Sequence, residues 1–124
     1  MHWTEKYIGQ EWIAGENDCW AFARKVWRQQ FGFEVPVVDV DACNRMACSR
    51  AFAGHDEKGS WQLVEKPQDG DAALIGKSKR PSHVGISVEG GVLHSVQGAG
   101  VIYSDIIGLS HMGLRVLGWY RRVV

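Results

Sequence analysis

The sequence lacks any long hydrophobic run, and no stretch approaches the length of a membrane-spanning helix. Residues 1–6 do not combine a basic segment with an apolar run, as a secretory signal peptide would. One sign of charge does not dominate either, because fourteen basic side chains balance fourteen acidic ones. These absences predict a protein made in the cytoplasm without a signal peptide, with no affinity for membrane or nucleic acid.

Cysteine is also scarce. The chain has three, an odd number, with no CxxC pair: Cys19, Cys43 and Cys48. A disulfide framework is therefore not expected, and at least one thiol stays outside any disulfide. Cys43 and Cys48 are five residues apart on a predicted helix, so they do not face together and are more typical of core or surface thiols. The sequence predicts no cofactor.

What the chain has in abundance is tryptophan, with six residues, and glycine, with fifteen. Its 124 residues suffice for a hydrophobic core without metals or disulfides, and 45 % apolar residues is ordinary for a globular protein. No repeat, low-complexity tract or linker interrupts it. We therefore expect residues 1–124 to form one domain.

Helices are predicted in the first part of the chain. Residues 1–18 form a short lead-in helix or turn followed by a loop, and the first long helix begins after them. Asn17 and Asp18 are good helix N-cap residues. From Cys19 the apolar residues follow helical spacing, and Gly32 suits the C′ position where the helix ends. A second helix is predicted over residues 40–53.

After Trp61 the pattern changes to short segments rich in β-branched and aromatic residues, separated by Gly, Pro or Ser. The predicted strands cover residues 72–75, 83–88, 92–96, 101–104 and 115–122. Helices followed by a meander of strands predict an α+β domain with an antiparallel sheet.

Cys19 lies at or next to the first residue of the first predicted helix. The partial positive charge of a helix N-terminus stabilises a thiolate, which is the nucleophilic form of cysteine. The alternative is a small buried residue, as cysteines outside disulfides often are.

Two histidines, His83 and His94, fall in a predicted β-hairpin. If the turn is Glu89-Gly90, residue 85 pairs with 94, and the histidines are diagonal neighbours on one face. If the turn is Gly90-Gly91, which favours a type I′ turn, they share a face but lie too far apart to touch. Contact would let His94 orient His83 as a general base, with Gly85 leaving room for substrate backbone. Two structural histidines are the alternative.

Four motifs in order resemble the NlpC/P60 family of cysteine peptidases over residues 5–123. They are Asp18-Cys19-Trp20, Gln68-Asp69-Gly70-Asp71, His83-Val84-Gly85-Ile86 and Leu93-His94-Ser95. Asp-Cys-Trp is closest to the short phage tail-assembly type. The resemblance implies a papain-like fold and hydrolysis of peptidoglycan stem peptides at a γ-D-glutamyl-diaminopimelate or related bond.

The resemblance also assigns roles to residues. Cys19 would be the nucleophile, His83 the general base and acid, His94 the orienting residue, and the Cys19 backbone N–H an oxyanion donor. Many members carry a tyrosine before the cysteine, and Trp12 is the nearest counterpart here. Trp12 or Trp20 could wall the groove. A zinc site made of Cys19, His83 and His94 is a further alternative, although closely spaced ligand pairs are missing.

The resemblance leaves four hypotheses. The first is a tail-associated endopeptidase of a phage or prophage, delivered to the cell wall by the particle and partnered by tail proteins. The others are an amidase effector of a secretion system, a non-catalytic tail-assembly component with the same fold, and an acyltransferase using the same Cys-His pair.

Overall fold

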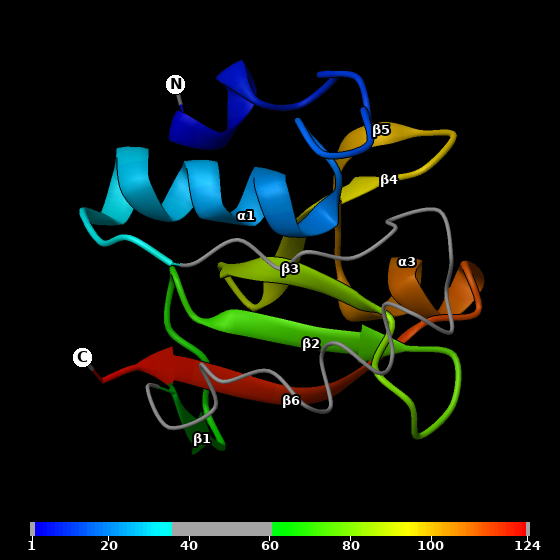
Figure 1. The fold of residues 1–124 in the computed structure, drawn as a ribbon. Coiled ribbons are helices and arrows are strands. Elements are labelled where there is room, and N and C mark those ends of the chain that lie inside the picture. Colours follow the sequence, from blue (N-terminus) through cyan, green and yellow to red (C-terminus); the bar gives the residue numbers. More distant parts are fainter. Residues whose placement is uncertain (1, 36–60, 124) are drawn as a thin grey trace.

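The computed structural model describes residues 2–35 and 61–123 (Figure 1). The helix predicted over residues 40–53, together with Cys43, Cys48 and His55, lies outside these residues.

The N-terminal part is helical, as predicted. A short 3-10 helix, η1 (Trp3–Lys6), precedes a loop, and α1 (Cys19–Val26) continues into a π-helical turn, η2 (Trp27–Phe31). Gly32 follows with φ of 75° and ψ of 22°, the left-handed conformation that ends many helices. The predicted helix therefore begins and ends at the expected residues, although its last turn is widened.

Six strands form one antiparallel sheet in the described part of the chain. They are β1 (Trp61–Val64), β2 (Ala72–Gly76), β3 (His83–Val88), β4 (Gly91–Val96), β5 (Gly100–Ser104) and β6 (Arg115–Arg122). Their order across the sheet is β1-β6-β2-β3-β4-β5. The predicted α+β class is confirmed, and the five predicted strands are present with bounds shifted by at most one residue.

Two elements were not predicted. The first is β1, which pairs with β6. The second is α3 (Ile106–His111), whose N-cap Asp105 accepts a 2.7 Å hydrogen bond from the Gly108 N–H. The last residue of this helix is His111. The strands are also not a simple meander, because β6 returns to lie between β1 and β2.

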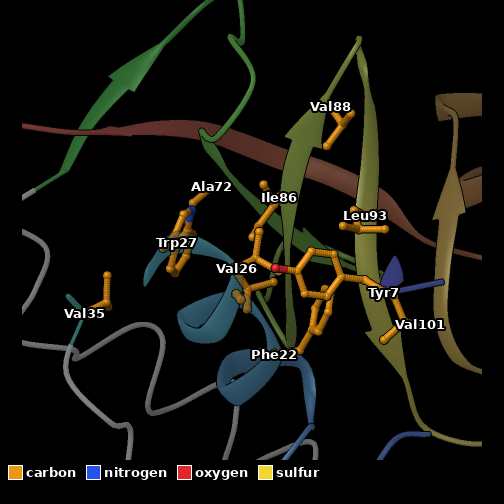
Figure 2. Close-up of a cluster of buried hydrophobic side chains, with 12 residues drawn as sticks. Tyr7, Phe22, Val26, Trp27, Val35, Ala72, Ile86, Val88, Leu93 and Val101 are labelled. Carbon is orange, nitrogen blue, oxygen red and sulfur yellow. The ribbon is translucent and has the colours of Figure 1, made fainter. Parts of the chain in front are cut away.

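Helix α1 packs on the sheet through its apolar side (Figures 1 and 2). Phe22, Ala23, Val26 and Trp27 are fully buried, as their helical spacing predicted. Their sheet partners include Ile86 and Leu93, and the Trp27 indole donates a 2.9 Å hydrogen bond to the Gly70 carbonyl. This packing fixes where the start of α1 lies.

A second apolar cluster involves α3. Leu109 packs there with Ala73, Ile75 and Val92. Because side chains alternate along a strand, His94 shares its face of β4 with Val92, whereas Leu93 points to the α1 cluster. His94 therefore lies on the face of the sheet that α3 covers.

Asp71 lies at the end of the turn that precedes β2, where its carboxylate binds both the turn backbone and a distant arginine. Its carboxylate accepts a 2.7 Å hydrogen bond from the Gln68 N–H and two bonds, of 2.8 and 3.0 Å, from the Arg121 guanidinium. Asp71 is only 4 % exposed, whereas the side chain of its partner Arg121 is 34 % exposed, so the ion pair lies at the edge of the buried core. It joins β6 to the turn that precedes β2.

Candidate active site

Cys19 is the first residue of α1 and is half-buried. The Asp18 carboxylate caps the helix: Oδ1 accepts from the Ala21 N–H and Oδ2 from the Gly15 N–H, both at 2.8 Å. Both carboxylate oxygens are thus engaged by the backbone, and the thiol of Cys19 stands at the positive end of the helix dipole. This position favours the thiolate form of a cysteine.

The loop before Cys19 is held against the sheet at two places. Its Gly9 N–H donates to the Val101 carbonyl and the Val101 N–H donates to the Gln10 carbonyl, both at 2.9 Å. Farther along, the Ser95 hydroxyl donates a 2.7 Å hydrogen bond to the Asn17 carbonyl. Strands β4 and β5 therefore determine the path of the chain into Cys19.

The structure selects between the two hairpin registers. Val88 pairs with Gly91 and Ile86 with Leu93, so the turn residues are Glu89 and Gly90. The diagonal contact follows: His83 Nε2 and His94 Nδ1 are 2.8 Å apart, and the ring centroids are separated by 5.0 Å.

His94 is fully buried, and its second ring nitrogen is also engaged. His94 Nε2 lies 2.9 Å from Ser104 Oγ. Burial lowers the pKa of His94 to about 4, because a charged imidazolium loses its hydration there. At neutral pH His94 is therefore uncharged and carries one ring N–H. It can donate only one of its two hydrogen bonds and must accept the other.

Cys19 and His83 line one open cavity of about 120 Å³. Its described lining is Trp12, Asp18, Cys19, Lys77, Ser82, His83, Ser95, Val96, Gln97 and Leu114. The cavity brings together four of the residues that the sequence singled out, namely Cys19, His83, Trp12 and Asp18. His94 stands behind His83, away from the cavity.

Two residues expected in the groove lie elsewhere. Trp20 is not among the described residues that line the cavity and packs edge-to-face on Trp27 in the core, with ring centroids 6.0 Å apart. Gly85 is buried, and a Cβ placed on it would lie 2.2 Å from Val92 Cγ1 and 3.1 Å from His94 Cβ. Its lack of a side chain makes room for strand β4, not for a substrate.

Sequence reasoning missed Ser95 and Ser104. Ser104 is the last residue of a predicted strand. The alternation of side chains along that strand could have placed its hydroxyl on the same face of the sheet as the histidines, and this was the available signal. Ser95 belongs to the Leu93-His94-Ser95 motif, but no local signal indicates that its hydroxyl contacts the Asn17 carbonyl.

The zinc alternative is not supported by the geometry of its three proposed ligands. Within residues 2–35 and 61–123 no three His, Cys, Asp or Glu side chains converge as a metal site would require. The two histidine nitrogens face each other across a hydrogen bond instead of pointing to a common centre.

Within residues 2–35 and 61–123, no helix is long and apolar enough to cross a membrane.

The fold and the cavity define a class: an α+β domain of papain-like type, with a cysteine at a helix N-terminus and a histidine at the start of a strand facing the same cavity. The chain belongs to the NlpC/P60 family, whose model matches residues 6–114. Members of this family are usually cysteine peptidases or amidases that act on cell-wall peptidoglycan. A search of curated proteins found no match.

Proposed function

We propose that this protein hydrolyses an amide bond in peptidoglycan stem peptides, of the γ-D-glutamyl-diaminopimelate type. Cys19 is the nucleophile, His83 the general base and acid, and His94 the residue that orients His83. The observation that carries the proposal is the 2.8 Å contact between His83 and His94, with His83 and Cys19 lining one cavity. The proposal takes residues 1–124 as one catalytic domain without a metal or cofactor.

The reaction begins with proton transfer from Cys19 Sγ to His83. Nε2 of His83 faces His94, so Nδ1 is the nitrogen that exchanges the proton. The thiolate attacks the substrate carbonyl, the C–N bond breaks, and His83 returns its proton to the leaving amine. A water molecule that loses a proton to His83 then attacks the thioester, which releases the acid and restores the Cys19 thiol.

Two donors suit the oxyanion that forms during attack. The backbone N–H of Cys19 lies at the start of α1, where the partial positive charge of the helix favours a developing negative charge. The indole N–H of Trp12, which lines the same cavity, is the second. Trp12 would thus replace the tyrosine found in many members of the family.

Lys77 gives the cavity a cationic edge suited to this substrate. It is exposed and lines the cavity, whereas the nearby Lys79 is exposed but is not among the described lining residues. Stem peptides carry carboxylates, which an ammonium group at the cavity edge would attract. Lys77→Gln should raise KM with little change in kcat, while the matched Lys79→Gln should change neither.

The decisive experiment is digestion of purified peptidoglycan by wild-type protein and by Cys19→Ala, with products identified by mass spectrometry. Cys43→Ala and Cys48→Ala serve as controls for loss of any thiol. New stem-peptide fragments should come from wild type and from both controls, but not from Cys19→Ala. No fragments from any protein, together with equal iodoacetamide reactivity of all three cysteines, would favour the non-catalytic assembly role.

We further propose that a phage or prophage tail delivers the enzyme to the cell wall. The Asp18-Cys19-Trp20 motif supports this, because it resembles the short tail-assembly type. Detection of the protein in purified tail particles would support the proposal. Its release through a secretion system, with a neighbouring immunity gene, would instead identify it as an effector amidase.

A further inference from the structure

We propose that Ser104 is a positioning residue for the reaction: its hydroxyl oxygen accepts the Nε2 proton of His94 and thereby leaves His94 Nδ1 able to accept from His83. This inference rests on the proposed function of Cys19 and His83. It extends the histidine pair into a chain of three side chains, one from each of the adjacent strands β3, β4 and β5.

The geometry of the chain is continuous. His83 Nε2 lies 2.8 Å from His94 Nδ1, and His94 Nε2 lies 2.9 Å from Ser104 Oγ. His94 is fully buried and Ser104 is 7 % exposed, so water cannot readily replace either partner. Removal of one member therefore leaves the next with an unmet hydrogen bond.

The direction of the chain follows from counting protons. Once Cys19 has given its proton to His83, the imidazolium carries an N–H on both nitrogens, and its Nε2–H needs an acceptor. His94 is uncharged and can accept at Nδ1 only if its own proton is on Nε2. That proton then points to Ser104 Oγ, which must accept it.

Met112 completes the arrangement. The Ser104 hydroxyl is 3.9 Å from Met112 Sδ at the end of α3. A thioether has no proton to donate, so Met112 can only accept. The Ser104 proton is directed towards the sulfur, and its oxygen remains available to His94.

The opposite direction would oppose catalysis. With the His94 proton on Nδ1, two N–H groups would face each other across the 2.8 Å contact as soon as His83 became charged. Ser104 therefore stabilises the thiolate–imidazolium pair by preventing this tautomer. Near that pair, the titratable groups among the described cavity residues are Asp18 and Lys77, with His94 behind His83.

The first test is the nitrogen-15 NMR spectrum of the histidine rings in the wild-type protein. The His94 proton is expected on Nε2 across the pH range in which Cys19 reacts. A His94 proton on Nδ1 would overturn the inference, and this readout requires neither a substrate nor a variant.

The second test compares the pH dependence of Cys19 alkylation by iodoacetamide in wild type, Ser104→Ala and Ser104→Thr. The matched control is Ser87→Ala, because Ser87 Oγ is buried on β3 without a hydrogen-bond partner. Loss of one hydrogen bond in a charged pair should slow alkylation of Ser104→Ala about tenfold or more near pH 6. Above about pH 9.5 its rate should equal that of wild type, because an ordinary thiol is then ionised.

Ser104→Thr should restore the wild-type profile, and Ser87→Ala should retain it. Identical profiles for Ser104→Ala and wild type would overturn the inference while leaving the proposed function intact. Failure of the proposed function is distinguishable, because Cys19 of the wild type would then titrate as an ordinary thiol and release no stem-peptide fragments.

Discussion

The Ser95 hydroxyl donates a 2.7 Å hydrogen bond to the backbone carbonyl of Asn17, two residues before Cys19. Ser95 also directly follows His94 in the chain and is fully buried. One hydrogen bond thus joins the strand that carries His94 to the turn that leads into Cys19. The spacing between Cys19 and the histidines is therefore set locally as well as by the core.

Ser95→Ala should both destabilise the protein and slow the reaction. It leaves a buried carbonyl without its donor, at a cost of about 1–2 kcal/mol in the free energy of unfolding. The rate should fall because Cys19 is less firmly placed. Urea unfolding and the peptidoglycan assay measure the two effects. Ser87→Ala, which removes an unpartnered hydroxyl, is the control, and full activity in Ser95→Ala would refute the positioning argument.

Trp12→Phe should lower kcat by roughly 10²-fold and leave KM nearly unchanged, since it removes the proposed oxyanion donor but keeps an aromatic ring. Trp20→Phe is the control, because Trp20 packs on Trp27 away from the described cavity lining. Steady-state kinetics on a defined stem peptide separates the two constants. An equal decrease in kcat for both variants would show that the Trp12 effect is one of packing.

Stability should fall as the pH is lowered from about 7 to 4. The folded-state pKa of His94 is about 4, below the ordinary value of 6.5, so the unfolded chain binds more protons in this window. The contribution of His94 is fully present above pH 6.5 and is lost as the pH falls towards 4, amounting to about 3 kcal/mol. Urea unfolding at a series of pH values measures it. His94→Gln should show a shallower dependence, and equal slopes would contradict the assignment.

Gly70→Ala should be more destabilising than Gly98→Ala. Both glycines have positive φ, +97° and +88°, so each variant bears the backbone strain of about 1 kcal/mol. Only at Gly70 would the new Cβ meet another residue, 2.7 Å from the Phe31 ring. We expect an additional loss of about 1–3 kcal/mol there, measured by urea unfolding. Equal losses would show that Phe31 moves away without cost.

The start of α1 and most strands could be predicted because their signals are local. Each signal lies within a few residues of the feature that it predicts. These signals are the Asp18 cap, the apolar spacing after Cys19 and Gly32 at the helix end. The strand β1 and its pairing with β6 depend on contacts between distant segments. Helix α3, with six residues, is too short to show a helical period.

The hairpin register could not be predicted from turn preferences alone. These favoured Gly90-Gly91, whereas Glu89 occupies the turn with φ of 49°. Gly91 serves the strand instead, because a Cβ there would lie 2.3 Å from the Tyr103 hydroxyl. That hydroxyl donates a 2.8 Å hydrogen bond to the Val88 carbonyl, across the hairpin. Contacts of Tyr103 from β5 thus favour the observed register, which the residue preferences of the two-residue turn do not predict.

Gly85 shows the same limit. A glycine beside a candidate catalytic histidine suggests space for a substrate, but here the space is filled by Val92 from the next strand. The sequence could predict which residues of β3 share one face of the sheet. It could not predict which side chain of the neighbouring strand packs against them.

The position of β6 has a consequence for synthesis on the ribosome. The segment made last among the strands, Arg115–Arg122, occupies an interior place between β1 and β2. Until it emerges from the exit tunnel, β1 has no partner among the described strands, and one edge of β2 lacks its neighbour in this sheet. The nascent chain therefore cannot complete the sheet, and folding of this part is delayed until residue 122 has left the ribosome.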